Sequence, residues 1–374
     1  MRLPMPRDTD ALTTSGSFES HTRTTLRPRT FGRDESLDIA KGFGIILVVL
    51  GHCLIGLITS NYFPASVLWP TLAVWIIYAF HMPLFFVVSG HLASGKHRPA
   101  GTTLSKLLPT VVYPYFLWSI LEGLTLMYLG RFTSSRVPIS SLYRILWIPI
   151  VPYWFLYALF FCHLGYLAIR KFSYRIQLTV AIAVFVAPMF FMPLIGRFQL
   201  SIVPETVRGF LYFVLGVISV QEVKQLGKWA AVIASIMFTV LGVAMYQSQV
   251  RGITGTFASV PVAIAGIAAT LAWSRLLAAQ EGAFIRRPTA ILAFLGRYSM
   301  SIYVMHIFFT AGMRTALKRL ASRPTALATV IEIVAAIVAG ILLPLGFNWL
   351  VSKFDLDKWF GLQHMGAQKH LSGN

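Results

Sequence analysis

Residues 37–58, LDIAKGFGIILVVLGHCLIGLI, form a long apolar run interrupted by Asp38, Lys41 and His52. A run of this length spans a bilayer core of about 30 Å as a helix, because each residue adds about 1.5 Å. Eleven helical steps separate Lys41 from His52, so both side chains lie on one face, about 16 Å apart along the axis. Ionisable residues inside a membrane helix are costly and usually functional. This spacing suits a reagent that enters from one membrane surface and reacts in the interior.

The composition indicates the same class of protein. Of the 374 residues, 56% are hydrophobic and 12% are charged, whereas soluble domains carry about 25% charged residues. The net charge of +19 does not indicate nucleic-acid binding, because the basic residues are spread over short connections, where they act as topology signals. Cys53 and Cys162 lie in apolar runs and have no disulfide or metal-site spacing. We interpret both as small buried hydrophobic residues.

Similar apolar runs recur along the chain, each near the length that crosses a bilayer. We therefore predict an all-α polytopic membrane protein with a single bundle of about ten transmembrane helices. The predicted helices are residues 37–59, 68–92, 104–130, 143–169, 176–196, 205–221, 229–247, 257–279, 288–314 and 325–351.

The predicted bundle divides the chain into three parts. Residues 1–33 are polar, rich in Thr, Ser and Arg, and have no apolar run. They do not resemble a cleaved signal peptide, and we expect a disordered basic cytosolic tail. Residues 34–351 form the membrane domain, and residues 352–374 form a second, short cytosolic tail. A cytosolic N-terminus puts about twice as many Lys and Arg residues inside as outside, which favours both termini in the cytosol.

The first helix offers two chemically distinct groups. Asp38 and Lys41 lie three residues apart and can form an ion pair at the cytosolic boundary. Lys41 can equally be a helix-end residue whose amine reaches the membrane surface. His52 suits proton transfer near neutral pH, and the alternative is a buried imidazole satisfied by one hydrogen bond.

The second helix ends in AFHMPLFFVVSGHL, residues 79–92. Pro83 interrupts the helical hydrogen-bond ladder and frees carbonyl groups near His81. Ser89 precedes a glycine, and small residues allow a neighbouring helix to approach closely. These residues describe either part of a polar site or a kinked packing helix.

The ninth helix carries a polar stripe. Ser299, Tyr303 and His306 fall at positions i, i+4 and i+7, on one helix face. The stripe predicts a side that faces a cavity, and the alternative is hydrogen bonding between helices. Glu122, in the third predicted helix, would be expensive in lipid and should face a cavity or the outer water boundary. The histidine spacings include no metal-binding motif.

Three stretches resemble the acyltransferase-3 family of membrane O-acyltransferases. They are LDIAKGFGIILVVLGH, FHMPLFFVVSGHL and LGRYSMSIYVMH, and PYWFLYALFF is a softer fourth match. The resemblance implies about ten membrane helices and transfer of an acyl group, commonly acetyl from cytosolic acetyl-CoA, to a hydroxyl of an extracytoplasmic or lipid-linked glycan. It covers about residues 34–350.

The resemblance also implies roles for individual residues. The family's first helix carries Arg or Lys, ten residues, and then His, and Lys41 and His52 match this pattern. His52 would be the catalytic histidine and Lys41 its basic partner. Ser299, Tyr303 and His306 match a Ser–Tyr–His helix pattern. The family places basic residues where the third helix begins, and the candidates to hold CoA are Lys96, Arg98 and Lys106. Asp38, His81, Ser89 and Glu122 are candidates to support the site or bind substrate.

The match is to the stand-alone subgroup, which includes exopolysaccharide acetyl- and succinyltransferases and fucose O-acetylases acting on nodulation signals. It implies a bacterial inner-membrane protein, with acetyl-CoA or succinyl-CoA as donor and a polysaccharide or lipid-linked oligosaccharide as acceptor. His52 would deprotonate the acceptor hydroxyl or carry the acyl group as an acyl-histidine. The competing hypotheses are a glycan or solute transporter and a non-catalytic scaffold. The acyl group, the acceptor sugar and the oligomeric state stay open.

Overall fold

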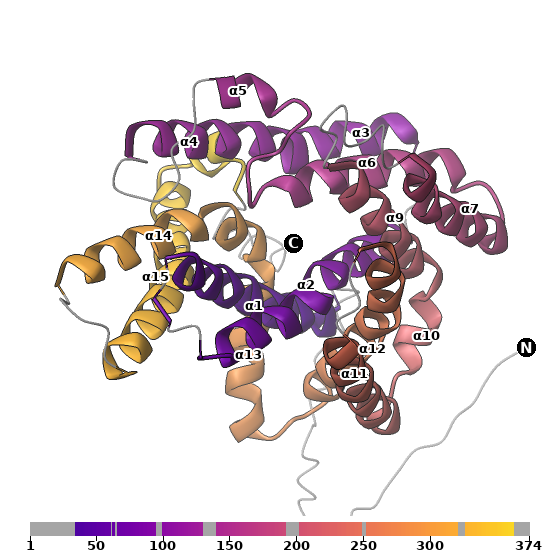
Figure 1. The fold of residues 1–374 in the computed structure, drawn as a ribbon. Coiled ribbons are helices and arrows are strands. Elements are labelled where there is room, and N and C mark those ends of the chain that lie inside the picture. The colour runs from indigo at the N-terminus through magenta and orange to yellow at the C-terminus, as the bar shows by residue number, and fades with distance from the viewer. Residues whose placement is uncertain are drawn as a thin grey trace, which may run out of the picture. The chain divides into compact units, whose positions relative to one another are not determined.

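The computed structural model describes residues 34–60, 62–63, 66–94, 99–129, 140–191, 202–248, 252–320 and 326–362. These residues fold almost entirely into helices, and no strand occurs among them (Figure 1). The predicted tail at 1–33 lies outside this range, as do residues 363–374 of the predicted C-terminal tail.

The helices are α1 (Glu35–Thr59), α2 (Trp69–Ser94), α3 (Ala100–Leu107), the π-helical turn η1 (Leu108–Val112), α4 (Tyr113–Leu129), α5 (Ser140–Arg144), α6 (Trp154–Ile169), α7 (Tyr174–Val186), α9 (Ile202–Ile218), α10 (Val220–Gln225), α11 (Lys228–Ser248), α12 (Gly252–Ala278), α13 (Ala283–Arg297), α14 (Ser299–Leu320), α15 (Ala326–Lys353) and the 3₁₀ turn η2 (Asp357–Phe360).

Seven of the described helical segments are long and apolar enough to cross a membrane, and the pair α13–α14 makes an eighth if it counts as one broken span. The chain is thus an all-α polytopic membrane protein, as predicted. The predicted number of ten transmembrane helices is not confirmed. Two of the remaining candidates are short: α6 has 16 residues and α9 has 17.

Two predicted helices differ from the structure in form. Residues 143–169 are not one helix, because α5 ends at Arg144 and α6 begins only at Trp154. Pro149 and Pro152 lie in between, and each disfavours helical geometry at the residue before it. Residues 288–314 are bent by 81° between α13 and α14, so the second half of this stretch runs in a different direction from the first.

The backbones of α2 and α9 approach each other closely at glycine residues. A Cβ atom added to Gly90 of α2 would lie 1.9 Å from the carbonyl oxygen of Phe213 in α9, and one on Gly216 of α9 would lie 2.0 Å from that of Val87. Membrane helices associate through such small residues because lipid gives no hydrophobic drive between them. Two glycines, one in each helix, therefore allow the close approach of α2 and α9, because each faces the backbone of the opposite helix.

Helix α1 lies among other helices, whereas α11 is peripheral. Helix α1 contacts α2, α12, α13, α14 and α15, and Figure 1 shows it in the middle of the view between α14–α15 and the pair α2–α13. In contrast, α11 exposes a stripe of large apolar side chains: Trp229, Ile233, Ile236, Met237, Val240 and Val243. A helix with such an uncovered apolar face suits contact with lipid tails. His52 is consequently carried by a helix of the bundle interior.

Candidate active site

Four side-chain rings from three helices form a row that includes His52. The centroid of the His52 ring in α1 lies 5.1 Å from that of His306 in α14 and 6.2 Å from that of Tyr78 in α2. Tyr78 continues the row to His81, with centroids 4.6 Å apart. His81 and His306 are almost fully buried, at 1% and 0% exposed. We call His52, Tyr78, His81 and His306 the imidazole cluster.

Hydrogen bonds fix the tautomers of two of these histidines. Nδ1 of His306 lies 2.7 Å from the carbonyl oxygen of Tyr303, and Nδ1 of His81 lies 2.7 Å from that of Ile77. A carbonyl can only accept, so each Nδ1 carries a hydrogen, and in the neutral ring each Nε2 then carries a lone pair. Nε2 of His306 is buried and has no partner among the described residues. The ring of His52 makes no hydrogen bond with the described residues either. The cluster therefore offers ring nitrogens that can accept a proton and that form no hydrogen bond with any described residue.

The polar stripe of α14 has a divided role. Tyr303 is buried and donates its hydroxyl to the carbonyl of Pro152, just before α6. Tyr153 makes a parallel link, donating to the carbonyl of Val304 at 2.9 Å. These two bonds tie α14 to the start of α6 and hold His306 in place. Ser299, at the first turn of α14, is half-buried and lies outside the imidazole cluster.

The predicted ion pair in α1 is present. Nζ of Lys41 lies 2.6 Å from Oδ1 of Asp38, and their side chains are 16% and 5% exposed. Lys41 is thus neutralised within its own helix, about 16 Å along the axis from His52. The structure does not bring Lys41 into the imidazole cluster.

Two further predicted residues, Ser89 and Lys106, lie together. They line a cavity of about 270 Å³ at the C-terminal ends of α2 and α6, beside η1, with Lys106 exposed at its rim. His163, Tyr166 and Arg170 of α6 and its end line the same cavity. We call it the Lys106 cavity. The candidates Lys96 and Arg98 lie outside the described residues.

Glu122 is buried at 6% exposed, and its Oε2 has no partner among the described residues. Within the described chain, no group of three or more His, Cys, Asp or Glu residues has the arrangement of a metal site. The structure therefore brings together His52, His81 and His306, and separately Ser89 and Lys106, whereas Lys41, Ser299 and Glu122 stand apart.

Sequence reasoning did not single out Tyr78, Tyr166 or Arg170 as residues of these groups. Tyr78 joins the two halves of the imidazole cluster, and its spacing of three residues from His81 places both on one helix face, which is a signal that the sequence carries. Arg170 directly follows the predicted helix 143–169, where a basic residue indicates only topology, and its position in the Lys106 cavity depends on how α6 packs against α9 and η1.

Comparison with known proteins gives consistent results. A family model described as an acyltransferase domain matches residues 34–349. The nodulation protein NolL of Mesorhizobium japonicum is 30% identical over 207 residues, which cover 52% of this chain and 50% of that protein. NolL of Sinorhizobium fredii is 31% identical over 203 residues, again 52% and 50% of the two chains. The chain thus matches about half the length of these curated relatives.

No solved structure matches the chain. The family match extends from the start of α1 almost to the end of α15 and therefore includes every residue of the imidazole cluster and of the Lys106 cavity. The chain belongs to the acyltransferase-3 family and is a multi-pass membrane member of it.

Proposed function

We propose that this protein moves an acyl group, most simply acetyl, from cytosolic acyl-CoA to a hydroxyl of a cell-surface or secreted glycan or its lipid-linked precursor. The observation that carries the proposal is the juxtaposition of His52 and His306, whose rings lie 5.1 Å apart with nitrogens that no described residue occupies. This pair lies within a chain matched by an acyltransferase family. An imidazole is the side chain best suited to move a proton near neutral pH.

The Lys106 cavity supports a donor site for CoA. It has Lys106 and Arg170 at its edge and the hydroxyl of Ser89 in its wall. CoA carries several phosphates, which Lys and Arg bind by charge-assisted hydrogen bonds. Ser89 lies eight residues beyond His81 in α2, a rise of about 12 Å along the helix. The flexible thioester arm of CoA would cover this distance toward the imidazole cluster.

The excess of basic residues on one side supports a cytosolic N-terminus. Helix α1 then leaves the cytosol and α2 returns to it, which puts the C-terminal end of α2 and the Lys106 cavity on the cytosolic side. The imidazole cluster would lie deeper in the membrane. A bacterial inner membrane, with both termini in the cytosol, completes the proposed location.

The chemistry is a transfer from thioester to ester. His52 takes the proton of the acceptor hydroxyl while its oxygen attacks the acyl carbonyl, and such general-base assistance is worth about 10²–10⁴-fold in rate. The carbon–sulfur bond breaks, and the imidazolium returns the proton to the thiolate, which leaves free CoA thiol and an ester. The hydroxyl of Tyr78 is the better candidate to stabilise the oxyanion, because Tyr303 already donates to Pro152.

An acyl-histidine intermediate would be an alternative route with the same products. In that route His52 attacks the thioester first, and CoA leaves before the acceptor reacts. Exchange of labelled CoA into acyl-CoA in the absence of acceptor would indicate the covalent route, and its absence would favour direct transfer.

The test compares ester-linked acyl groups on the host's secreted polysaccharide by NMR. A deletion strain receives either the wild-type protein or His52→Ala at matched membrane levels. The proposal expects the wild type to restore an acyl signal, which also identifies the group, and the variant to restore none. Equal restoration by both would refute the role of His52, and lost glycan export with unchanged acylation would favour a transporter.

A further inference from the structure

A second, larger cavity borders the imidazole cluster at Tyr78. Its volume is about 560 Å³, within the range of about 300–1,000 Å³ of small-molecule sites. It is formed by the middle of α2, the first turn of α6, the first two-thirds of α9, Ser259 of α12 and the segment before α6. Tyr78, Trp154, Glu205, Arg208, Tyr212 and Ser259 line it, and we call it the Arg208 pocket.

The two cavities follow each other along the same pair of helices. In α2 the Arg208 pocket takes residues 78–86, whereas the Lys106 cavity begins at Ser89. In α6 the order is the same, with Trp154 in the Arg208 pocket and His163 in the Lys106 cavity. The two cavities share no lining residue, so they are separate sites that follow each other along α2 and α6, and each can hold its own ligand.

Tyr78 connects the Arg208 pocket to His52. This side chain lines the pocket, and its ring stands at 74° to the His52 ring with centroids 6.2 Å apart. Gly51, the neighbour of His52, leaves room for it, because a Cβ atom there would lie 2.9 Å from the Tyr78 ring. A ligand in the pocket would thus contact Tyr78 and be separated from His52 by this one aromatic ring.

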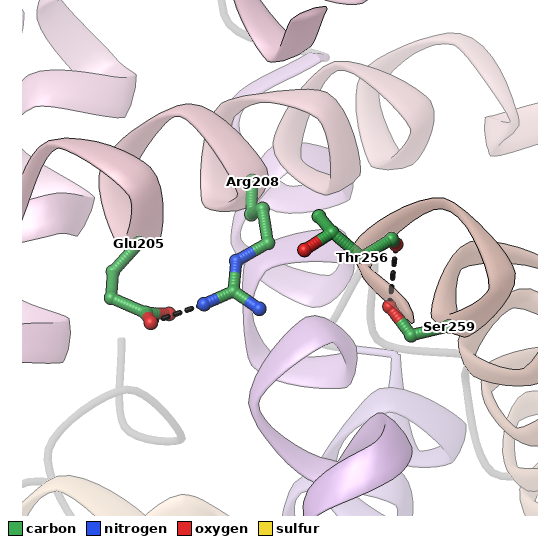
Figure 2. Close-up of polar contacts among 4 residues, drawn as sticks. All are labelled: Glu205, Arg208, Thr256 and Ser259. Carbon is green, nitrogen blue, oxygen red and sulfur yellow. Dashed lines mark hydrogen bonds and ion pairs between the residues drawn. The ribbon is translucent and has the colours of Figure 1, made fainter. Parts of the chain in front are cut away.

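The charged side chains that line the pocket form an ion pair with no net charge. Arg208 donates to Glu205 one turn earlier in α9, and their side chains are 36% and 39% exposed. Figure 2 shows the pair on one side and Thr256 and Ser259 of α12 on the other, with the hydroxyl of Ser259 donating to the carbonyl of Thr256 at 2.7 Å. Both members of the pair keep hydrogen-bonding capacity beyond their mutual contact.

Helix α2 adds a backbone acceptor. Pro83 has no N–H, so the carbonyl of Ala79 lacks its usual helical donor, and both residues line the Arg208 pocket. A carbonyl in a membrane interior needs a donor from elsewhere. A ligand hydroxyl would supply it.

We propose, on the basis of the proposed function, that the Arg208 pocket binds the acceptor as a neutral sugar ring. Arg208 and Glu205 present donors and acceptors to hydroxyl groups, while Tyr78, Trp154 and Tyr212 give flat apolar surface for the ring faces. Glu205 disfavours the phosphates of CoA, and its pairing with Arg208 removes the excess positive charge that an anionic sugar would need. The pocket therefore separates the acceptor from the donor as well as binding it.

The test measures binding and kinetics with separate readouts. Methyl glycosides of neutral hexoses and 6-deoxyhexoses, with methyl glucuronide as the charged counterpart, are titrated calorimetrically into protein in lipid nanodiscs. Neutral glycosides should bind the wild type more tightly than the glucuronide. Arg208→Gln should weaken binding and raise the acceptor KM by about tenfold or more, because a hydrogen bond to a charged group is lost. The KM for acetyl-CoA should change by less than about twofold.

Two further variants separate recognition from folding. The charge-swapped double variant Glu205→Arg/Arg208→Glu can restore the ion pair but reverses its positions, so a purely structural role predicts rescue and recognition predicts none. Ser259→Trp should fill the pocket and block the sugar. Full rescue by the swap, unchanged sugar affinity in Arg208→Gln and Ser259→Trp, or no binding of any neutral glycoside to the wild type would overturn the proposal. Sugar binding without acyl transfer in the wild type would refute the proposed function and leave this pocket supported.

Discussion

The contact between α2 and α9 makes Gly90→Ala an informative perturbation. The new Cβ atom would lie 1.9 Å from the carbonyl oxygen of Phe213, whereas Cβ atoms essentially never approach such atoms within 3.0 Å. The two helices must therefore separate locally by about 1 Å. Overpacking of this kind costs about 1–3 kcal/mol, and the better helix propensity of Ala returns at most about 1 kcal/mol. We expect a net loss of about 1–2 kcal/mol in the free energy of unfolding.

Gly101→Ala is the matched control. Gly101 lies in α3, and a Cβ atom there would meet nothing within 4 Å, so this variant should be as stable as the wild type or gain up to about 1 kcal/mol. The assay is reversible unfolding in mixed micelles with increasing SDS, followed by far-UV circular dichroism. Since α2 carries Tyr78 and His81, the rate of acyl transfer should fall in Gly90→Ala and stay constant in Gly101→Ala. Equal stability of the two variants would refute the close approach of α2 and α9.

Three further predictions concern the site. Lys41→Met removes the ammonium group that contacts the Asp38 carboxylate, whose side chain is 5% exposed. It should lower the free energy of unfolding by about 2 kcal/mol in the same SDS assay, because a hydrogen bond to a charged group is lost. His306→Gln should lower kcat for acyl transfer by about 10²-fold, with the KM for acyl-CoA unchanged, in a steady-state assay of CoA thiol release. Arg170→Ala should raise the KM for acyl-CoA by about tenfold, most strongly at low ionic strength, because a phosphate contact is lost.

Each of these predictions has a matched comparison. Lys41→Arg keeps the ion pair and should retain most of the stability, so equal losses in both variants would contradict the pairing argument. An unchanged kcat in His306→Gln would remove His306 from the site. Lys171→Ala removes a charge next to Arg170 from an exposed residue outside the Lys106 cavity, and an equal rise in KM there would show only a general charge effect.

The sequence predicts most of the separate helices well, because a long apolar run has few alternatives in a membrane. Residues 37–59, 68–92 and 229–247 correspond within two residues to α1, α2 and α11. The prediction of one helix over residues 143–169 rested on hydropathy, which carries no information on backbone geometry. Pro149 and Pro152 are the sequence signal for the break between α5 and α6. The 81° bend before α14 depends on how α13 packs against α1, where Gly296 approaches the backbone of Asp38.

The geometry of the candidate site could be predicted only in part from the sequence. Spacing within one helix correctly paired Asp38 with Lys41. The approach of His306 to His52 is a contact between helices more than 250 residues apart in sequence, and helical periodicity cannot supply it. Helical periodicity is equally insufficient for Arg208 and Glu205. Their spacing of three residues predicts only an ion pair within one helix. Their place in a cavity follows from the packing of α9 against α2.

The most direct test of the central claim is a single-turnover measurement on purified protein in nanodiscs. Release of CoA thiol from acetyl-CoA is followed at saturating acceptor glycan for the wild type and for His52→Ala, after both show the same SDS unfolding profile. The account predicts a loss of about 10²-fold or more in the variant, because the base that takes the hydroxyl proton is gone. A variant that keeps the wild-type rate within about twofold would contradict the assignment of His52 as the catalytic residue.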